Sequence, residues 1–311
     1  MMGRSFEYEE FKAVIVENVQ RRLGKQVVIE INKVVKNNSL EFDSMVIRES
    51  GRKCSPNFYL NLLYKEYLDG GDIECIVDTV IEQYRKPEPE GIEDITFEFD
   101  KCSDKIICRL VSKERNRSML DMIPYIPFLD MVITFHYIVI DDASGLGSVR
   151  VTNAMLDMWG ITTKNLYNIA IQNTMRMFPK VFCSMKSMLG SMLNDDEKEL
   201  LPEGIFEDEN NGEPYVLTNL KGINGAAVMV YPGCMDEISN MIGGDFYILP
   251  SSIHEVLIVA DDGMLSASEL INMVCDVNEK CVLPDEILSD RVYRYSAEKG
   301  KVEMCETVAE K

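Results

Sequence analysis

Hydrophobic residues recur at helical spacing near the start of the chain and stop at Gly24, at the positions Phe6, Phe11, Val14, Ile15, Val19 and Leu23. This period predicts an amphipathic helix over residues 6–23. Two strand-like runs follow, Gln26 to Val35 and Leu40 to Arg48, on either side of the polar segment Lys36 to Ser39. Their arrangement predicts a β-hairpin.

Two further helices are predicted before residue 90. Ser55-Pro56 resembles a cap followed by a first-turn proline, which predicts a helix to about Leu68, and Gly70-Gly71-Asp72 precedes another helix through Tyr84. The run Lys86 to Gly91 contains two prolines and a glycine and cannot continue a helix. We therefore expect an N-terminal helix-hairpin-helix unit over residues 1–88 and a larger domain over residues 92–311.

Strand and helix patterns alternate through the second region. The predicted strands span residues 105–111, 131–140, 215–218, 225–231, 246–249 and 255–260. The predicted helices span residues 152–159, 163–177 and 235–241, with one more that begins at Ser266 in a Ser-x-x-Glu capping box. Intermixed strands and helices with hairpins predict an α+β fold, in which the larger unit has a mixed sheet with helices on one face.

Charge is distributed unevenly along the chain. The net charge is −20, and residues 121–311 carry 13 basic and 30 acidic side chains, a net charge of −17. Nucleic acids and anionic membranes are bound by clustered Lys and Arg, so neither is an expected partner. A protein or a small cationic ligand fits this charge better. The acidic run over residues 194–213 is typical of a solvated loop.

Nine cysteines are scattered without a Cys-x-x-Cys pair, and an odd number does not predict a disulfide framework. The N-terminus lacks the apolar segment of a signal peptide, and the longest apolar run, Leu129 to Ile140, contains Asp130, Thr134 and His136. These features predict a cytoplasmic protein whose reduced cysteines act as small hydrophobic residues.

The segment around His254 allows two interpretations. In the first, His254 is a general base for Ser251 or Ser252, and Asp245 or another carboxylate orients its ring, as nucleophilic catalysis requires. In the second, His254 is a hydrogen-bonded residue at the start of a strand and the serines form a turn after Pro250. Strand alternation would place Ser252 and His254 on one face. Since the chain has no Gly-x-Ser-x-Gly motif, the structural interpretation is favoured.

Metal and phosphate motifs are weak throughout the chain. His254 and His136 are the only histidines, so a His-Glu-x-x-His zinc site is absent from the sequence. Two Asp-Asp pairs, Asp141-Asp142 and Asp261-Asp262, are candidates for magnesium, although aspartates at turns usually serve the turn itself. The glycines form no phosphate-binding loop. We therefore predict no metal and no cofactor.

A small-molecule pocket is best predicted between Asp245 and Glu255. This segment combines the aromatic residue Tyr247, a turn fixed by proline, two hydroxyls and the imidazole of His254. Pockets for small molecules show the same mixture of apolar wall and few polar groups. The strand over residues 131–140, with His136, is the expected neighbour, because both strands end in Asp-Asp turns.

The run Leu-Pro-Ser-Ser-Ile-His-Glu at residues 249–255 resembles a signature of an uncharacterised family of bacterial proteins of unknown function, common in Gram-positive anaerobes. The resemblance extends over most of the chain beyond the linker at residues 86–91. It is sharpest in residues 116–130, 224–233, 244–259 and 288–295. It implies an intracellular mixed α/β protein and assigns no activity to any residue.

No catalytic motif outweighs its structural interpretation, so the sequence favours a cytoplasmic, acidic, non-catalytic protein that binds a ligand or a protein partner. The alternative is a hydrolase that uses Ser251 or Ser252 with His254. The sequence leaves the oligomeric state open.

Overall fold

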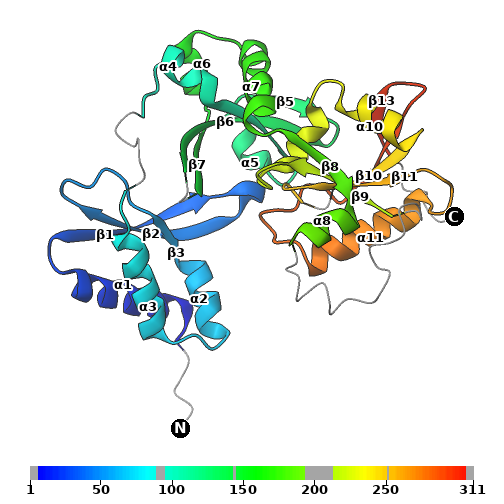
Figure 1. Cartoon of the computed structure of the whole chain (residues 1–311). Coiled ribbons are helices and arrows are strands. Elements are labelled where there is room, and N and C mark those ends of the chain that lie inside the picture. Colours follow the sequence, from blue (N-terminus) through cyan, green and yellow to red (C-terminus); the bar gives the residue numbers. More distant parts are fainter. Residues whose placement is uncertain (1–5, 89–94, 143–144, 193–212, 251, 306–311) are drawn as a thin grey trace. The chain divides into compact units, whose positions relative to one another are not determined.

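A computed structural model describes residues 6–88, 95–142, 145–192, 213–250 and 252–305 (Figure 1). Three sheets with packed helices confirm the predicted α+β class. Within the described residues, no helix combines the length and apolarity that a bilayer crossing requires. Ser251, most of the acidic run over residues 194–213 and part of the linker over residues 86–91 lie outside the described residues.

The chain divides into two compact units. The first comprises Met1–Thr96 and Val139–Gly147, and the second comprises Phe97–Ile138 and Ser148–Lys311. The domain boundary predicted between residues 88 and 92 falls at residues 89–94, which the structure does not describe, and it stays a prediction.

The first unit places three helices on one face of a three-stranded antiparallel sheet of order β1-β2-β3 (Figure 1). Its elements are α1 (Tyr8–Leu23), β1 (Val27–Val35), η1 (Asn37–Ser39), β2 (Glu41–Glu49), β3 (Asn57–Tyr59), α2 (Leu60–Leu68) and α3 (Ile73–Arg85). The apolar stripe of α1 packs with strand residues such as Met45 and Ile47 in one buried cluster. The predicted first helix and hairpin are therefore confirmed.

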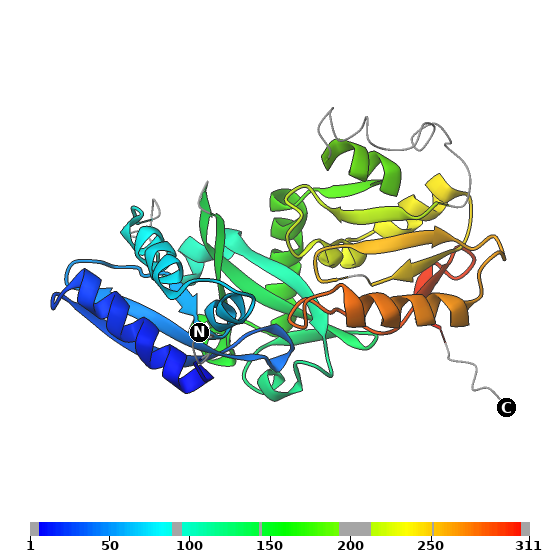
Figure 2. The ribbon, with the colours of Figure 1, turned by 90° about the horizontal axis from the view of Figure 1, so that it is seen from below.

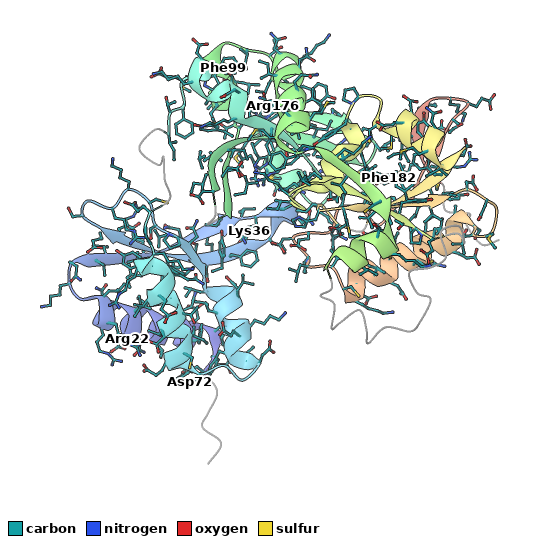
Figure 3. All side chains as sticks on the ribbon, in the orientation of Figure 1. Arg22, Lys36, Asp72, Phe99, Arg176 and Phe182 are labelled. Atoms are coloured by element: carbon teal, nitrogen blue, oxygen red, sulfur yellow. The ribbon has the colours of Figure 1, made fainter. Side chains whose placement is uncertain are left out.

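Polar contacts fix the ends and the packing of these helices. The Asp72 carboxylate caps α3 by accepting hydrogen bonds from the backbone N–H groups of Glu74 and Cys75, at 3.0 and 3.3 Å. Arg22 near the end of α1 forms ion pairs with Glu74 and Asp78 on α3. Figure 3 labels Arg22 and Asp72 on this unit. These side chains are exposed or half-exposed, so solvent screens the ion pairs and they contribute little to stability.

The second unit contains a sheet of order β4-β6-β5, in which β7 also pairs with β6. The elements that lie wholly or partly in this unit are α4 (Phe99–Cys102), η3 (Ser103–Lys105), β4 (Ile106–Ser112), α5 (Arg117–Leu120), β5 (Tyr125–Phe128), β6 (Met131–Asp142), β7 (Gly145–Arg150), α6 (Asn153–Trp159) and α7 (Thr163–Met177). The end of β6 and the start of β7 fall in the segment Val139–Gly147, which is assigned to the first unit. Helix α7 packs against β4, where the Thr174 hydroxyl accepts a 2.8 Å hydrogen bond from the Cys108 N–H.

A six-stranded antiparallel sheet completes the second unit, in the order β13-β12-β10-β11-β9-β8. Figure 2 shows β8, β9, β11 and β10 side by side in this order. The elements are β8 (Lys180–Ser184), α8 (Met185–Met192), β9 (Tyr215–Asn219), η4 (Gly225–Val230), α10 (Cys234–Ile242), β10 (Phe246–Leu249), β11 (Val256–Ala260), α11 (Ala267–Lys280), β12 (Tyr293–Ser296) and β13 (Lys301–Met304). Leu270, Ile271 and Val274 of α11 pack with Leu249 and Val292.

One carboxylate joins the two sheets of the second unit. Asp130, in the turn between β5 and β6, accepts a 2.6 Å hydrogen bond from the Tyr293 hydroxyl and a 2.7 Å hydrogen bond from the Ser289 hydroxyl. Tyr293 is fully buried, and its burial together with the negative charge of Asp130 raises the pKa of its phenol.

Several predicted elements are wrong. The predicted helix from Ser55 begins only at Leu60, because Asn57–Tyr59 pairs with β2 as strand β3. The predicted strand over residues 225–231 is the 3-10 helix η4, whose Ala226 N–H donates to the Ile253 carbonyl at 3.1 Å. The second unit has two sheets rather than one.

Gly225 lies where the backbones of two loops come together. A Cβ atom at this position would overlap the Thr218 hydroxyl and the His254 carbonyl oxygen, and it would lie 2.9 Å from the Asn219 nitrogen. Only glycine permits this approach without a shift of the backbone.

Replacement of Gly225 by alanine is expected to lower the free energy of unfolding by about 1–3 kcal/mol, because the added methyl group overpacks a buried contact. Gly244→Ala is the matched control, since a Cβ there meets no atom within 4 Å. Chemical denaturation of both variants measures the difference. Equal stabilities would show that the contact at Gly225 is not tight.

Tyr293→Phe is expected to destabilise the protein by about 1.5–3 kcal/mol, because the half-buried Asp130 carboxylate loses a hydrogen-bond donor. Tyr215→Phe is the control. The Tyr215 side chain is half-buried against Phe182, at 5.0 Å between ring centroids, and its hydroxyl has no described hydrogen bond. Thermal unfolding measures the melting temperature of each variant. Equal melting temperatures for Tyr293→Phe, Tyr215→Phe and the wild type would contradict the role of Asp130.

Candidate functional site

The loop between β10 and β11 is folded around Ser252. The Ser252 hydroxyl donates to Glu255 Oε1 at 2.8 Å and accepts from the His254 backbone N–H at 2.9 Å. The Ser252 N–H donates to the Glu255 carbonyl at 3.2 Å, and the residue is 5% exposed. These contacts form a tight turn, so the predicted strand alternation that placed Ser252 and His254 on one face is wrong.

Both nitrogens of the His254 ring face protein groups. Nδ1 accepts a 3.2 Å hydrogen bond from the Asn224 backbone N–H, which requires the proton of a neutral ring to lie on Nε2. Nε2 lies 3.3 Å from Glu286 Oε1. The ring is thus oriented by one backbone group and one carboxylate, and the Ser252 hydroxyl contacts the backbone of His254 rather than its ring.

The turn before η4 holds this loop in place. Asn224 adopts a left-handed conformation, with a φ of 52°, which aims its N–H at the His254 ring. The Thr218 hydroxyl at the end of β9 donates a 2.7 Å hydrogen bond to the His254 carbonyl. The close approach of Gly225 described above brings these groups together.

A pocket of about 440 Å³ opens beside the loop. Its lining combines two carboxylates, an imidazole, a hydroxyl, a thiol and two valines, from Gly222, Ser252, His254, Glu255, Val277, Cys281, Val282 and Glu286. The Ile253 N–H donates to the Glu286 carbonyl at 2.8 Å, which ties the segment after α11 to the loop. The wall is therefore partly apolar and carries negative charge from Glu255 and Glu286.

The structure gathers only some of the predicted site residues. Ser252 and His254 line the pocket. Tyr247 on β10 and Asp245, which directly precedes β10, do not. Asp245 forms a 2.7 Å ion pair with Arg294 and accepts from the Ala297 N–H. Tyr247 packs beside the cluster under α11, and burial raises the pKa of its phenol.

The expected neighbourhood of the two histidines is wrong. His136 lies on β6, which pairs with β4, β5 and β7, while the loop of His254 belongs to the other sheet. Strand 131–140 therefore does not pair with residues 245–255. The His136 side chain is buried, and its Nε2 lies 3.4 Å from the Thr134 hydroxyl.

Glu286, Cys281 and Asn224 belong to the site but were not predicted from the sequence. Glu286 follows His254 by 32 residues, without a motif that links them. The Asn224-Gly225 pair could have indicated the turn before η4, because asparagine before glycine favours a left-handed turn. Among the described residues, no group of three or more His, Cys, Asp or Glu side chains is arranged to hold a metal ion.

Comparison with curated proteins and with solved structures gives no match for this chain. A family described as of unknown function, DUF5688, matches residues 8–297, so the expected membership of an uncharacterised family is confirmed. The signature around His254 and an origin in Gram-positive anaerobes stay predictions. The match covers both compact units, and the chain belongs to the DUF5688 family.

Proposed function

We propose that this chain is a non-catalytic cytoplasmic protein that binds a small cationic ligand in the pocket beside the β10–β11 loop. The observation that carries the proposal is the combination of the Glu255 and Glu286 carboxylates with the apolar Val277 and Val282 in one pocket. Its volume of about 440 Å³ falls in the range of roughly 300–1,000 Å³ of small-molecule sites.

The charge of the surrounding chain supports a cationic ligand. Residues 121–311 have a net charge of −17, which attracts cations and repels phosphate backbones over about 8 Å at physiological salt. All nine cysteines are free, as expected in a reducing compartment.

The hydrolase alternative has weaker support. A catalytic base would need a ring nitrogen directed at the nucleophile, but His254 Nε2 faces Glu286 and the Ser252 hydroxyl donates to Glu255. The polar groups of the loop are thus used to fix its shape. A ligand would meet the two carboxylates and the apolar side chains of the pocket.

Glu286→Gln is expected to weaken binding of an organic cation at least about tenfold, or about 1.4 kcal/mol, because it removes the charge opposite His254. Calorimetric titration with spermidine, agmatine and tetramethylammonium tests amine, guanidinium and quaternary ammonium groups. Glu279→Gln is the matched control, because Glu279 is exposed on α11 and does not line the pocket.

Equal affinities in Glu286→Gln and Glu279→Gln, or no binding of any of the three probes, would overturn the proposed ligand class. Labelling by a serine-reactive fluorophosphonate separates the hydrolase alternative. Labelling of the wild type that is lost in Ser252→Ala or Ser251→Ala would establish a nucleophilic serine instead.

A further inference from the structure

One face of the β4-β6-β7 region collects basic and hydroxyl side chains. Arg109 on β4 pairs with Thr134 on β6, and Ile107 pairs with His136. Paired residues of antiparallel strands point to the same side, so Arg109, Thr134 and His136 share a face. The neighbouring Cys108 points the other way, toward Thr174 of α7.

Strand β7 adds two more side chains to this face. The Val151 N–H donates to the Phe135 carbonyl at 2.9 Å, which places the end of β7 beside the middle of β6. Arg109 Nη2 donates to the Ser148 hydroxyl at 2.8 Å, so Ser148 lies on the face of Arg109. Arg150 follows Ser148 by two residues and shares this face by strand alternation.

The two arginines have no counter-charge within the described part of the chain. No carboxylate lies within ion-pair distance of either guanidinium in those residues. The Nε atoms of Arg109 and Arg150 are both shielded from solvent and lack a hydrogen-bond partner. Buried charges in proteins are normally paired, and a shielded donor without an acceptor costs about 1–3 kcal/mol.

The pKa values of the cluster reflect the burial of two positive charges close together. Burial, together with the nearby Arg150, lowers the pKa of the Arg109 guanidinium to about 10, and burial also lowers the pKa of Arg150. Burial and both arginines lower the pKa of His136 well below its usual value. At neutral pH the cluster therefore contains two positive charges and a neutral imidazole.

We propose that Arg109, Ser148 and Arg150 form a binding site for a small dianionic oxyanion, a phosphate monoester group. Two guanidinium groups match two negative charges, and the planar fork of arginine matches the oxygen spacing of a phosphate. Both arginine side chains are half-buried overall, so an oxyanion can reach them from solvent. The site is separate from the acidic pocket beside His254 and does not depend on the function proposed for it.

The test uses the full chain with inorganic phosphate and phenyl phosphate as probes, and acetate as a monoanion. The wild type is expected to bind both phosphates and to gain thermal stability with them, while acetate at equal concentration has little effect. Arg150→Met and Arg109→Met are each expected to weaken phosphate binding by at least about tenfold. In the absence of phosphate, Arg150→Met is expected to melt higher than the wild type, because an unpaired buried charge is removed.

Arg176→Met is the matched control, because Arg176 is an exposed arginine on α7, labelled in Figure 3, that donates to the Asp104 carbonyl. Glu286→Gln is expected to leave phosphate binding unchanged. If a methionine variant fails to fold, Arg150→Lys keeps the charge but loses the fork, and an intermediate affinity is expected. The proposal is wrong if the wild type binds neither phosphate, if acetate stabilises it equally, or if the arginine variants bind as Arg176→Met does.

Discussion

The arrangement of the candidate site depends on the close contact between Gly225 and the His254 carbonyl. This contact lets the Asn224 N–H reach the His254 ring and lets the Ala226 N–H reach the Ile253 carbonyl. A side chain at residue 225 would separate the two loops, and the His254 ring would lose the donor that fixes its tautomer. The shape of the pocket is therefore set by backbone packing more than by the side chains that line it.

The sequence predicted helices and strands correctly where the hydrophobic residues of a segment followed one clear periodicity. The helical stripe of residues 6–23 and the hairpin that follows it both occur, because each buries one face against a common core. Residues 225–231 are apolar and were predicted as a strand, but Gly225–Val230 forms a 3-10 helix, and its Ala226 N–H donates to the carbonyl of Ile253 in a distant loop. The helix predicted at Ser55 failed because Asn57–Tyr59 completes the edge of a sheet. Tertiary pairing overrides propensity in both cases.

The candidate sites were predictable only in part for the same reason. The sequence indicated Ser252 and His254 as candidates but not Glu286, because no local sequence pattern indicates which distant segments will come into contact. The arginine cluster was equally invisible, because Arg109 and Arg150 lie 41 residues apart on strands that both neighbour β6. The carboxylate of Asp130 joins two sheets through residues more than 150 positions away. Contacts of this kind follow from topology rather than from composition.

The two regions differ in how the fold uses their polar groups. At the β10–β11 loop, the Ser252 hydroxyl both donates and accepts, and each nitrogen of the His254 ring faces a protein group. Groups that are used in this way fix the shape of the loop. On the β4-β6-β7 face, by contrast, the Nε donors of two arginines have no acceptor among the residues that the structure describes, although the chain as a whole is acidic. Since carboxylates outnumber basic side chains, with 52 against 32, a shortage of acids does not explain unpaired arginines. An anion supplied from outside the described residues is the simplest source of the missing charge.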